Sequence, residues 1–265
     1  ALHYGILASP VRDGGSGERS EPIGALREQM FLQEDKMTRR KFDLSAYLVI
    51  GPENTEGRPV ARIIAEAVRA GFTFVQIRAK HAEAREIIEL TRAAADVIAA
   101  QGKSDAVALV INDRLDAVLA AREQGIKVDG VHVGQGDIPP DVCRKYLGAD
   151  AIVGLSARTT ELLAYAAHCD TACIDYLGAG PLHATPTKPE AGRTSSGEIV
   201  TRSLDELAEL HRISPVPVVV GGGVKAADLP ALRATGVEGF FVISAVAGAE
   251  HPYSAAEELV ELWRA

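Results

Sequence analysis

The most informative part of the sequence reads Leu109-Val110-Ile111-Asn112-Asp113, then a helix-like segment, then Gly130-Val131-His132-Val133-Gly134-Gln135-Gly136-Asp137. Each half is a short apolar, β-branched run followed by a carboxamide and a carboxylate, which is typical of a buried parallel strand leaving its sheet. In parallel α/β folds, the loops at the carboxyl ends of the strands gather in one place and carry the active site. We therefore expect Asp113 and Asp137 to face each other across neighbouring strand ends.

Paired carboxylates at such an edge predict a magnesium site. Mg²⁺ prefers hard oxygen ligands and keeps several waters when it also binds phosphate, so one or two protein carboxylates can hold it. The alternative is that Asp113 caps a helix beginning near Arg114, and that Asp137 caps one beginning near Pro139-Pro140. The occurrence of the two carboxylates at successive strand ends favours the metal interpretation.

Strand-like and helix-like segments alternate outward from this stretch. The expected strands are residues 46–50, 74–78, 106–111, 130–133, 152–155, 174–178, 216–220 and 239–243. The expected helices are residues 59–70, 81–100, 115–124, one beginning at 139–140, 160–168, 204–212, 226–235 and 255–263. Eight near-equal units over about 220 residues predict a closed (β/α)8 TIM barrel of the α/β class, rather than the competing doubly wound open sheet.

The first residues differ from this pattern. Residues 11–20 are polar and glycine-rich, with neither a strand period nor a helix period. We expect residues 1–36 to be a poorly structured, flexible extension without a role in the chemistry. A single TIM-barrel catalytic domain is expected over residues 37–265, with Met37 as the natural-looking start.

Composition narrows the classes of function. The chain has 265 residues, a hydrophobic fraction of 47% and a formal net charge of −8. That charge argues against general nucleic-acid binding, and no apolar run reaches the roughly 18 residues of a membrane span. The three cysteines lack CxxC spacing, so they predict neither a disulfide framework nor a zinc site. With no apolar secretory signal, this composition predicts a cytoplasmic protein.

Positive charge is concentrated after the second expected strand, in Gln76-Ile77-Arg78-Ala79-Lys80. Alternation places Gln76, Arg78 and Lys80 on one side of the strand, and a cationic pair entering a barrel mouth needs an anionic partner. Arg offers a planar fork and Lys a mobile point charge, both suited to phosphate oxygens. Pairing with nearby acids such as Glu83 is the alternative.

Further anion contacts are expected after the last three strands. The loop of residues 178–189 is too long for a plain connection and carries two hydroxyls and Lys188. Gly221-Gly222-Gly223 follows the seventh strand and Ser244 the eighth, where barrels commonly bind phosphate through backbone N–H groups. The alternatives are a proline-stiffened surface loop and an ordinary tight turn.

These residues divide into two expected anion sites in one barrel mouth. The metal-assisted site comprises Arg78, Lys80, Asp113 and Asp137, and the metal-free site comprises Gly221-Gly222-Gly223 and Ser244. Such a pair suits an enzyme that joins a diphosphate substrate to a phosphorylated nucleophile. His132 is interpreted as a packed, hydrogen-bonded core residue rather than a ligand, and His183 is given no role.

Seven motifs, in family order from about residue 44 to the C-terminus, resemble those of the thiamine phosphate synthase (thiamine-phosphate pyrophosphorylase) family. The matching motifs are Gln76-Ile77-Arg78-Ala79-Lys80, Asn112-Asp113-Arg114, Gly130 to Asp137, Gly154-Leu155-Ser156, Gly180-Pro181 with Thr185-Pro186-Thr187-Lys188, Gly221-Gly222-Gly223-Val224, and Val242-Ile243-Ser244-Ala245. The chain departs from the family pattern at Gly136, which replaces the acidic residue usual before Asp137.

The resemblance implies condensation of hydroxymethylpyrimidine diphosphate with hydroxyethylthiazole phosphate, or its carboxylated form, giving thiamine phosphate and pyrophosphate. It assigns Mg²⁺ to Asp113 and Asp137. It assigns the pyrimidine diphosphate to Gln76, Arg78, Lys80, Asn112, Ser156 and Lys188, among which Arg78, Lys80, Ser156 and Lys188 are the expected catalytic residues. It assigns the thiazole phosphate to Thr185, Thr187, Gly222, Ile243 and Ser244. A homodimer is what the family suggests.

The implied chemistry requires the pyrimidine methylene carbon to lose pyrophosphate. An electron-rich aminopyrimidine can stabilise the resulting cation, so a dissociative displacement is expected, in which the protein neutralises the leaving group and aligns the thiazole nitrogen. One alternative is a thiazole tautomerase-like isomerase, which would not need the cations Arg78 and Lys80 or the pair Asp113 and Asp137. Another is a non-catalytic phosphate-ligand sensor, in which a metal site would be superfluous.

Overall fold

The computed structural model describes residues 40–157, 161–185 and 199–265. Its centre is a closed barrel of parallel strands in sequence order, β1 to β8, which confirms the predicted TIM barrel. The strands are β1 (Ala46–Ile50), β2 (Phe74–Ile77), β3 (Ala108–Asn112), β4 (Gly130–Val133), β5 (Ile152–Ser156), β6 (Tyr176–Ala179), β7 (Val218–Gly221) and β8 (Gly239–Val242). Pairing of β1 with β8 closes the ring.

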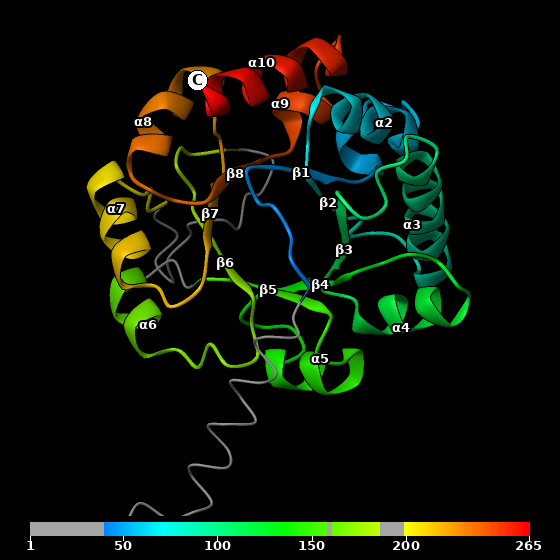
Figure 1. Ribbon diagram of the computed structural model, residues 1–265, viewed down its shortest axis with the longest axis horizontal. Coiled ribbons are helices and arrows are strands. Elements are labelled where there is room, and N and C mark those ends of the chain that lie inside the picture. The colour runs from blue at the N-terminus through cyan, green and yellow to red at the C-terminus, as the bar shows by residue number, and fades with distance from the viewer. Residues whose placement is uncertain (1–39, 158–160, 186–198) are drawn as a thin grey trace, which may run out of the picture. The chain divides into compact units, whose positions relative to one another are not determined.

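Helices surround this ring on its outer side (Figure 1). The α-helices are α2 (Val60–Ala70), α3 (Ala84–Ala99), α4 (Leu115–Glu123), α5 (Pro140–Leu147), α6 (Leu162–His168), α7 (Leu204–Ile213), α8 (Leu229–Ala234), α9 (Ser244–Ala247) and α10 (Pro252–Arg264). Short 3-10 turns occur at η1 (Pro52–Asn54) and η2 (Ala226–Asp228). No helix in the described part of the chain is long and apolar enough to cross a membrane.

Two apolar layers hold the barrel together. Outward-facing strand residues such as Leu48 and Ile111 pack against the helices in one large cluster. Inward-facing residues such as Tyr47, Phe74 and Tyr176 form a smaller cluster inside the barrel. The division follows the period of two along each strand, since neighbouring side chains point to opposite faces.

Local sequence signals explain where elements begin and end. Helix α2 follows Pro59, buries an apolar face that includes Ile63 and Ile64, and ends at Gly71, whose φ of 114° is left-handed. Glycine tolerates this conformation because it has no Cβ atom. Helix α7 begins after Ser203, whose hydroxyl accepts a hydrogen bond from the Glu206 backbone N–H at 3.1 Å.

Several predicted boundaries were wrong by one to three residues. The predicted strand of residues 174–178 is β6 (Tyr176–Ala179), and the predicted helix of residues 81–100 is α3 (Ala84–Ala99). The predicted helix of residues 226–235 is divided into η2 and α8. Helix α9, which begins at Ser244, was not predicted because four residues are too few to show a helical period. The predicted extension over residues 1–36 lies outside the described residues.

Candidate active site at the carboxyl ends of the strands

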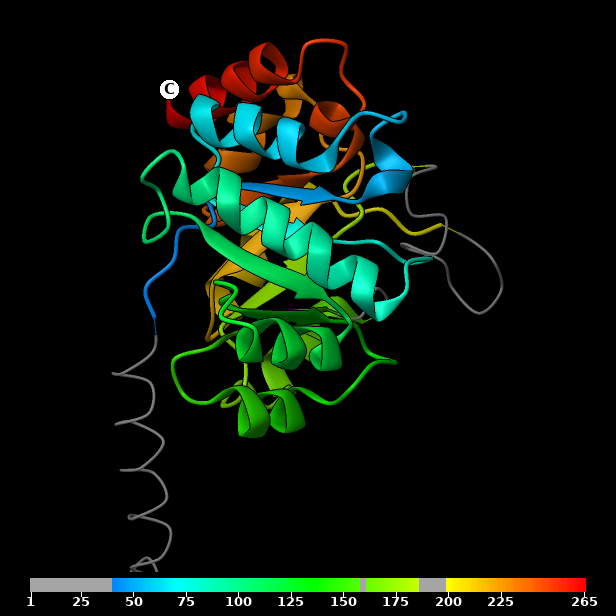
Figure 2. The same cartoon turned by 90° about the vertical axis from the view of Figure 1, so that its right-hand side faces the viewer.

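The predicted site residues lie where the strands end. Figure 2 shows the strands from the side, with their arrowheads directed toward one end of the barrel. At this end Gln76 is buried inside β2, Arg78 is 8% exposed just beyond it, and Lys80 is exposed. Gly51, directly after β1, allows the segments that follow β1 and β2 to approach each other closely. A Cβ atom at Gly51 would lie 1.9 Å from the Arg78 carbonyl oxygen.

Asp113 and Asp137 lie together, as the sequence predicted. The two carboxyl groups share a side-chain hydrogen bond, and Asn112 also hydrogen-bonds to Asp113. The Asp137 carboxylate accepts a second hydrogen bond, from the Gly134 backbone N–H at 2.7 Å. Neither carboxylate caps a helix, since α4 and α5 have Arg114 and Pro139 at their N-cap positions without side-chain caps. The capping alternative is therefore wrong.

The environment of Asp113 resists its ionisation. Burial, the hydrogen bond from Asp137 and the negative charge of Asp137 raise the pKa of Asp113 from 3.8 to about 6, against the opposing charge of Lys80. Its backbone is left-handed, with φ of 63°, an uncommon conformation for a residue with a Cβ atom. Perturbed pKa values and uncommon backbone conformations both cluster at functional sites, so Asp113 is a candidate functional residue.

We predict that Asp113→Asn stabilises the metal-free protein. Between about pH 4 and pH 6 the folded chain binds a proton at Asp113 that the unfolded chain has released, so this carboxyl lowers stability as pH rises through that window. Asn removes the repulsion and tolerates positive φ. Because Asp113 is partly exposed, we expect a gain of only about 1 kcal/mol at pH 7.5.

Urea unfolding in excess chelator measures this effect. The difference between the two proteins should disappear below about pH 4, where the carboxyl is protonated in both states. Adding Mg²⁺ should stabilise the unchanged protein more than the variant, because an ion stabilises a protein by binding its folded state more tightly than its unfolded state. A destabilised Asp113→Asn variant in chelator would show that the two carboxylates do not repel each other.

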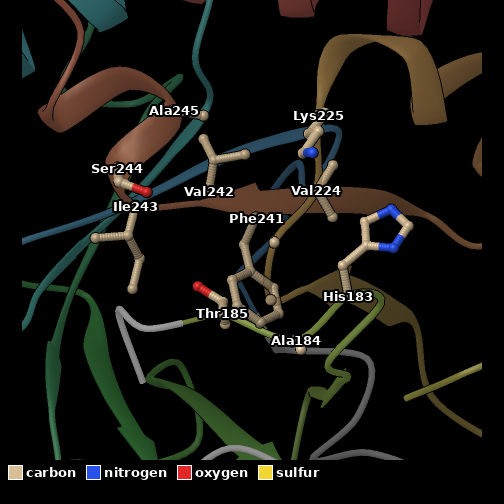
Figure 3. A pocket seen from close by; sticks show the side chains of 12 residues that line it. His183, Ala184, Thr185, Val224, Lys225, Phe241, Val242, Ile243, Ser244 and Ala245 are labelled. Carbon is tan, nitrogen blue, oxygen red and sulfur yellow. The ribbon is translucent and has the colours of Figure 1, made fainter. Parts of the chain in front are cut away.

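A separate pocket of about 350 Å³ lies between the loops after β6, β7 and β8 (Figure 3). Its lining includes Thr185, Gly222, Ile243 and Ser244, which are four of the five residues predicted to receive the thiazole phosphate. In Figure 3, Thr185 and Ser244 lie on one side of the Phe241 ring and His183 lies on the other. Tertiary structure thus brings together the described residues that the family resemblance assigns to the thiazole phosphate.

Backbone contacts join two of these loops. The Leu182 and His183 N–H groups donate to the Gly221 and Gly222 carbonyl oxygens at 3.0 and 2.9 Å. Gly222 has φ of 82°, and a Cβ atom there would lie 2.6 Å from Pro181. Only glycine meets both demands, because a residue with a Cβ atom would be strained at this φ and would collide with Pro181.

Two histidines occupy different environments. His183, which was given no role, lies 3.0 Å from an Asp228 carboxylate oxygen at the pocket edge. His132 is 7% exposed inside the barrel and hydrogen-bonds to Tyr176 and Ser156, which confirms its interpretation as a core residue. Sequence reasoning missed Tyr47 and Tyr176 as its neighbours, although both interrupt otherwise aliphatic strands with a hydroxyl.

Ser156 is the last residue of β5 and lies beside the loop that carries Asp137. Gln135, in the loop after β4, donates to the Ser156 carbonyl oxygen at 2.7 Å and to the Tyr165 hydroxyl at 2.9 Å. This contact fixes the loop that carries Asp137 against the next strand. Predicted residues Thr187 and Lys188 lie outside the described residues.

Comparison with known proteins shows which family this chain belongs to. A family model described as thiamine monophosphate synthase matches residues 46–246. The chain belongs to this family. Curated thiamine-phosphate synthases share this relationship: the one from Vibrio parahaemolyticus is 38% identical over 76% of this chain and 89% of its own length. The one from Corynebacterium efficiens is 38% identical over 82% of this chain and 94% of its own length.

Solved structures agree with this assignment. Thiamine phosphate pyrophosphorylase from Pyrococcus furiosus superposes with a TM-score of 0.67 at 27% identity, over 83% of this chain and 96% of that one. A 3-hexulose-6-phosphate synthase, with a TM-score of 0.55 at 17% identity, shares the fold alone. Thiamine-phosphate synthases are transferases of thiamine biosynthesis, and the chain is an enzyme of this class, as the sequence motifs predicted.

Proposed function

We propose that this enzyme condenses hydroxymethylpyrimidine diphosphate with hydroxyethylthiazole phosphate, or its carboxylated form, to give thiamine phosphate and pyrophosphate. The observation that carries the proposal is the pairing of two distinct sites at one end of the barrel. One site is formed by the cations Arg78 and Lys80 and the carboxylates Asp113 and Asp137. The other is a pocket lined by residues that include Gly222 and Ser244. A tautomerase would have no use for the first site.

Asp113 and Asp137 fit a magnesium ion. The described residues contain no group of three or more His, Cys, Asp or Glu that could hold a metal, so a closed site of many protein ligands is not expected there. Mg²⁺ needs few protein ligands when diphosphate oxygens and waters complete its shell, and bound Mg²⁺ would supply positive charge to the leaving pyrophosphate. A cation between the carboxylates would also offset the repulsion that raises the Asp113 pKa.

The cationic side chains would hold the diphosphate. Arg78 can bind two phosphate oxygens through its planar guanidinium, and Lys80 and Lys188 add mobile positive charge. As the carbon–oxygen bond breaks, negative charge grows on the leaving group, so these contacts strengthen toward the transition state. The dissociative displacement then needs neither a nucleophilic cysteine nor a general base.

Gln76 and Asn112 would recognise the pyrimidine diphosphate from the barrel side. The Gln76 side-chain amide nitrogen donates to the Tyr47 hydroxyl at 2.6 Å, while its carbonyl oxygen is buried without a hydrogen-bond partner in the described part of the chain. A buried acceptor of this kind costs free energy until a donor meets it. The exocyclic amine of an aminopyrimidine supplies such a donor.

The pocket after β6, β7 and β8 would anchor the thiazole phosphate. Thr185 and Ser244 offer hydroxyl donors, Gly222 allows close approach of the backbone, and Thr187 completes the predicted set. The phosphate is remote from the reacting nitrogen, so its anchor aligns the nucleophile without taking part in bond breaking.

Incubation with both substrates and Mg²⁺ tests the proposal. We expect thiamine phosphate and pyrophosphate in equal amounts, with no product when either substrate is omitted. Isomerisation of a thiazole phosphate without the pyrimidine substrate would support the tautomerase instead. Binding of a phosphate ligand with neither reaction would support the sensor.

We predict that deleting residues 1–36 leaves kcat nearly unchanged. All eight strands of the barrel, and the described members of both sites, come from residue 46 onward. Steady-state kinetics of the shortened and full chains provides the measurement, with circular dichroism to confirm folding. A folded, shortened protein that loses most of its activity would show that the extension contributes to the site.

A further inference from the structure

A continuous line of hydrogen bonds crosses the barrel interior and joins two residues of the proposed pyrimidine diphosphate site. The Gln76 amide nitrogen lies 2.6 Å from the Tyr47 hydroxyl, which lies 2.9 Å from the Tyr176 hydroxyl. The Tyr176 hydroxyl lies 2.9 Å from His132 Nδ1, and His132 Nε2 lies 2.9 Å from Ser156 Oγ. We call these five residues the barrel relay.

Glycines make room for the barrel relay. A Cβ atom at Gly154 would lie 2.2 Å from the Tyr176 ring, so β5 must have a residue without a side chain here for the tyrosine to reach across the barrel. A Cβ atom at Gly178 would lie 3.2 Å from the His132 ring, which stacks on Tyr176 at a centroid distance of 5.4 Å. The ring positions are therefore fixed by packing, not only by hydrogen bonds.

Both tyrosines remain neutral. Burial raises the pKa of Tyr47 and of Tyr176 well above the ordinary value of 10.0. Each phenol therefore has one proton to donate and can also accept. In a line of such groups, the direction of one hydrogen bond fixes the direction of the next.

The direction follows from Gln76. Its amide nitrogen can only donate, so the Tyr47 hydroxyl accepts this hydrogen bond and donates its own hydrogen bond to the Tyr176 hydroxyl. Tyr176 accepts from Tyr47 and must then donate to His132 Nδ1. A neutral imidazole that accepts at Nδ1 bears its proton on Nε2, so His132 donates to Ser156 Oγ.

We propose that His132 is a positioning residue that holds its proton on Nε2 and donates it to Ser156 Oγ, so that the Ser156 hydroxyl proton is directed to an anionic ligand. The identity of this ligand as the substrate diphosphate rests on the proposed function. The barrel relay thereby ties the donor state of Ser156 to the amide orientation of Gln76, on the far side of the barrel. A reversed Gln76 amide would reverse every bond, so that Ser156 would donate its proton to His132 and could only accept hydrogen bonds from the ligand.

Nitrogen-15 NMR of the histidine rings tests the direction in the intact protein without substrate. Of the seven histidines, His132 is assigned by the signals that disappear in His132→Gln. At about pH 8 we expect a neutral ring with its proton on Nε2. In Tyr176→Phe, which keeps the packed ring but removes the donor to Nδ1, the two tautomers should become mixed. A proton on Nδ1 in the unchanged protein would overturn the proposal.

Kinetics tests whether His132 acts through Ser156. His132→Ala should lower kcat roughly ten- to a hundredfold, as the loss of a residue that orients a catalytic group does in other enzymes. His132→Gln, whose amide nitrogen lies near the former Nε2 position, should recover most of that loss. In a Ser156→Ala background, His132→Ala should cost less than about threefold, because the group it positions is gone.

Independent, multiplying losses at the two positions would reduce His132 to a packing role and overturn the proposal. The outcomes are separable from those of the reaction itself. Absence of thiamine phosphate in the substrate assay would refute the proposed function, whereas the wrong tautomer would refute only the barrel relay's direction.

Discussion

Replacing Asp113 or Asp137 by Asn is expected to lower kcat/KM by about a hundredfold or more, at a Mg²⁺ concentration that saturates the unchanged protein. The two carboxyl groups lie within hydrogen-bonding distance, so an ion held between them would contact both. If these two carboxylates hold the ion, loss of one would remove half of the negative charge that they place beside it. The remaining carboxylate would hold the ion more weakly, so less of the enzyme would carry the positive charge proposed to neutralise the leaving pyrophosphate.

Titration of activity against Mg²⁺ measures the change. Each variant should need a higher Mg²⁺ concentration for half-maximal activity, and excess chelator should abolish activity in the unchanged protein. Asp116→Asn is the matched control, because Asp116 is an exposed residue of α4 that pairs with Arg114. Its loss should change kcat/KM by less than about twofold. Full activity of the unchanged protein in chelator would exclude the metal site.

Lys188→Ala is expected to lower kcat itself. The diphosphate that Lys188 would contact gains negative charge as the carbon–oxygen bond breaks. Removal of a preorganised donor to such a charge costs about 2–4 kcal/mol, which corresponds to roughly 30- to 1000-fold in rate. Lys145→Ala is the matched control, because Lys145 lies exposed on α5 beside Tyr146.

Ser244→Ala should fail differently. Ser244 lines the pocket proposed for the thiazole phosphate, and its contact there changes little between bound substrate and transition state. A hydrogen bond to a charged group suggests a loss of about 1.5–3 kcal/mol, seen as a higher KM for the thiazole phosphate while kcat stays within a few-fold.

Steady-state kinetics with each substrate varied in turn separates the two variants. A Ser244→Ala protein with a raised KM for the pyrimidine diphosphate alone would reverse the placement of the two substrates. A Lys188→Ala protein with unchanged kcat would remove Lys188 from the leaving-group site. The two results are independent, because the proposed contacts are with different substrates.

Much of the site could be predicted because its residues follow strands directly. Asp113 comes one residue after β3, Arg78 one residue after β2, and Ser244 two residues after β8. In a parallel barrel, every strand ends at the same face, so a polar residue in that position is brought to the site by topology alone. The period of two predicted in the same way that Gln76 points inward.

Short or irregular elements could not be predicted from local pattern. The four-residue helix α9 and the division of η2 from α8 depend on how the chain turns over the barrel end. Their sequences carry too few residues for a helical period, so tertiary packing decides their form.

From the sequence alone, the barrel, the two expected anion sites and the family motifs could be predicted. The alternation of strands and helices is visible in short stretches of the chain, and so are the polar residues that directly follow the strands. Only the tertiary structure decided the state of the groups within those sites. The raised pKa of Asp113 requires Asp137 beside it, and the barrel relay requires Gln76 and Ser156 to be joined across the interior by residues of three other strands. Burial, electric field and hydrogen-bond direction depend on such through-space neighbours, which no local pattern records.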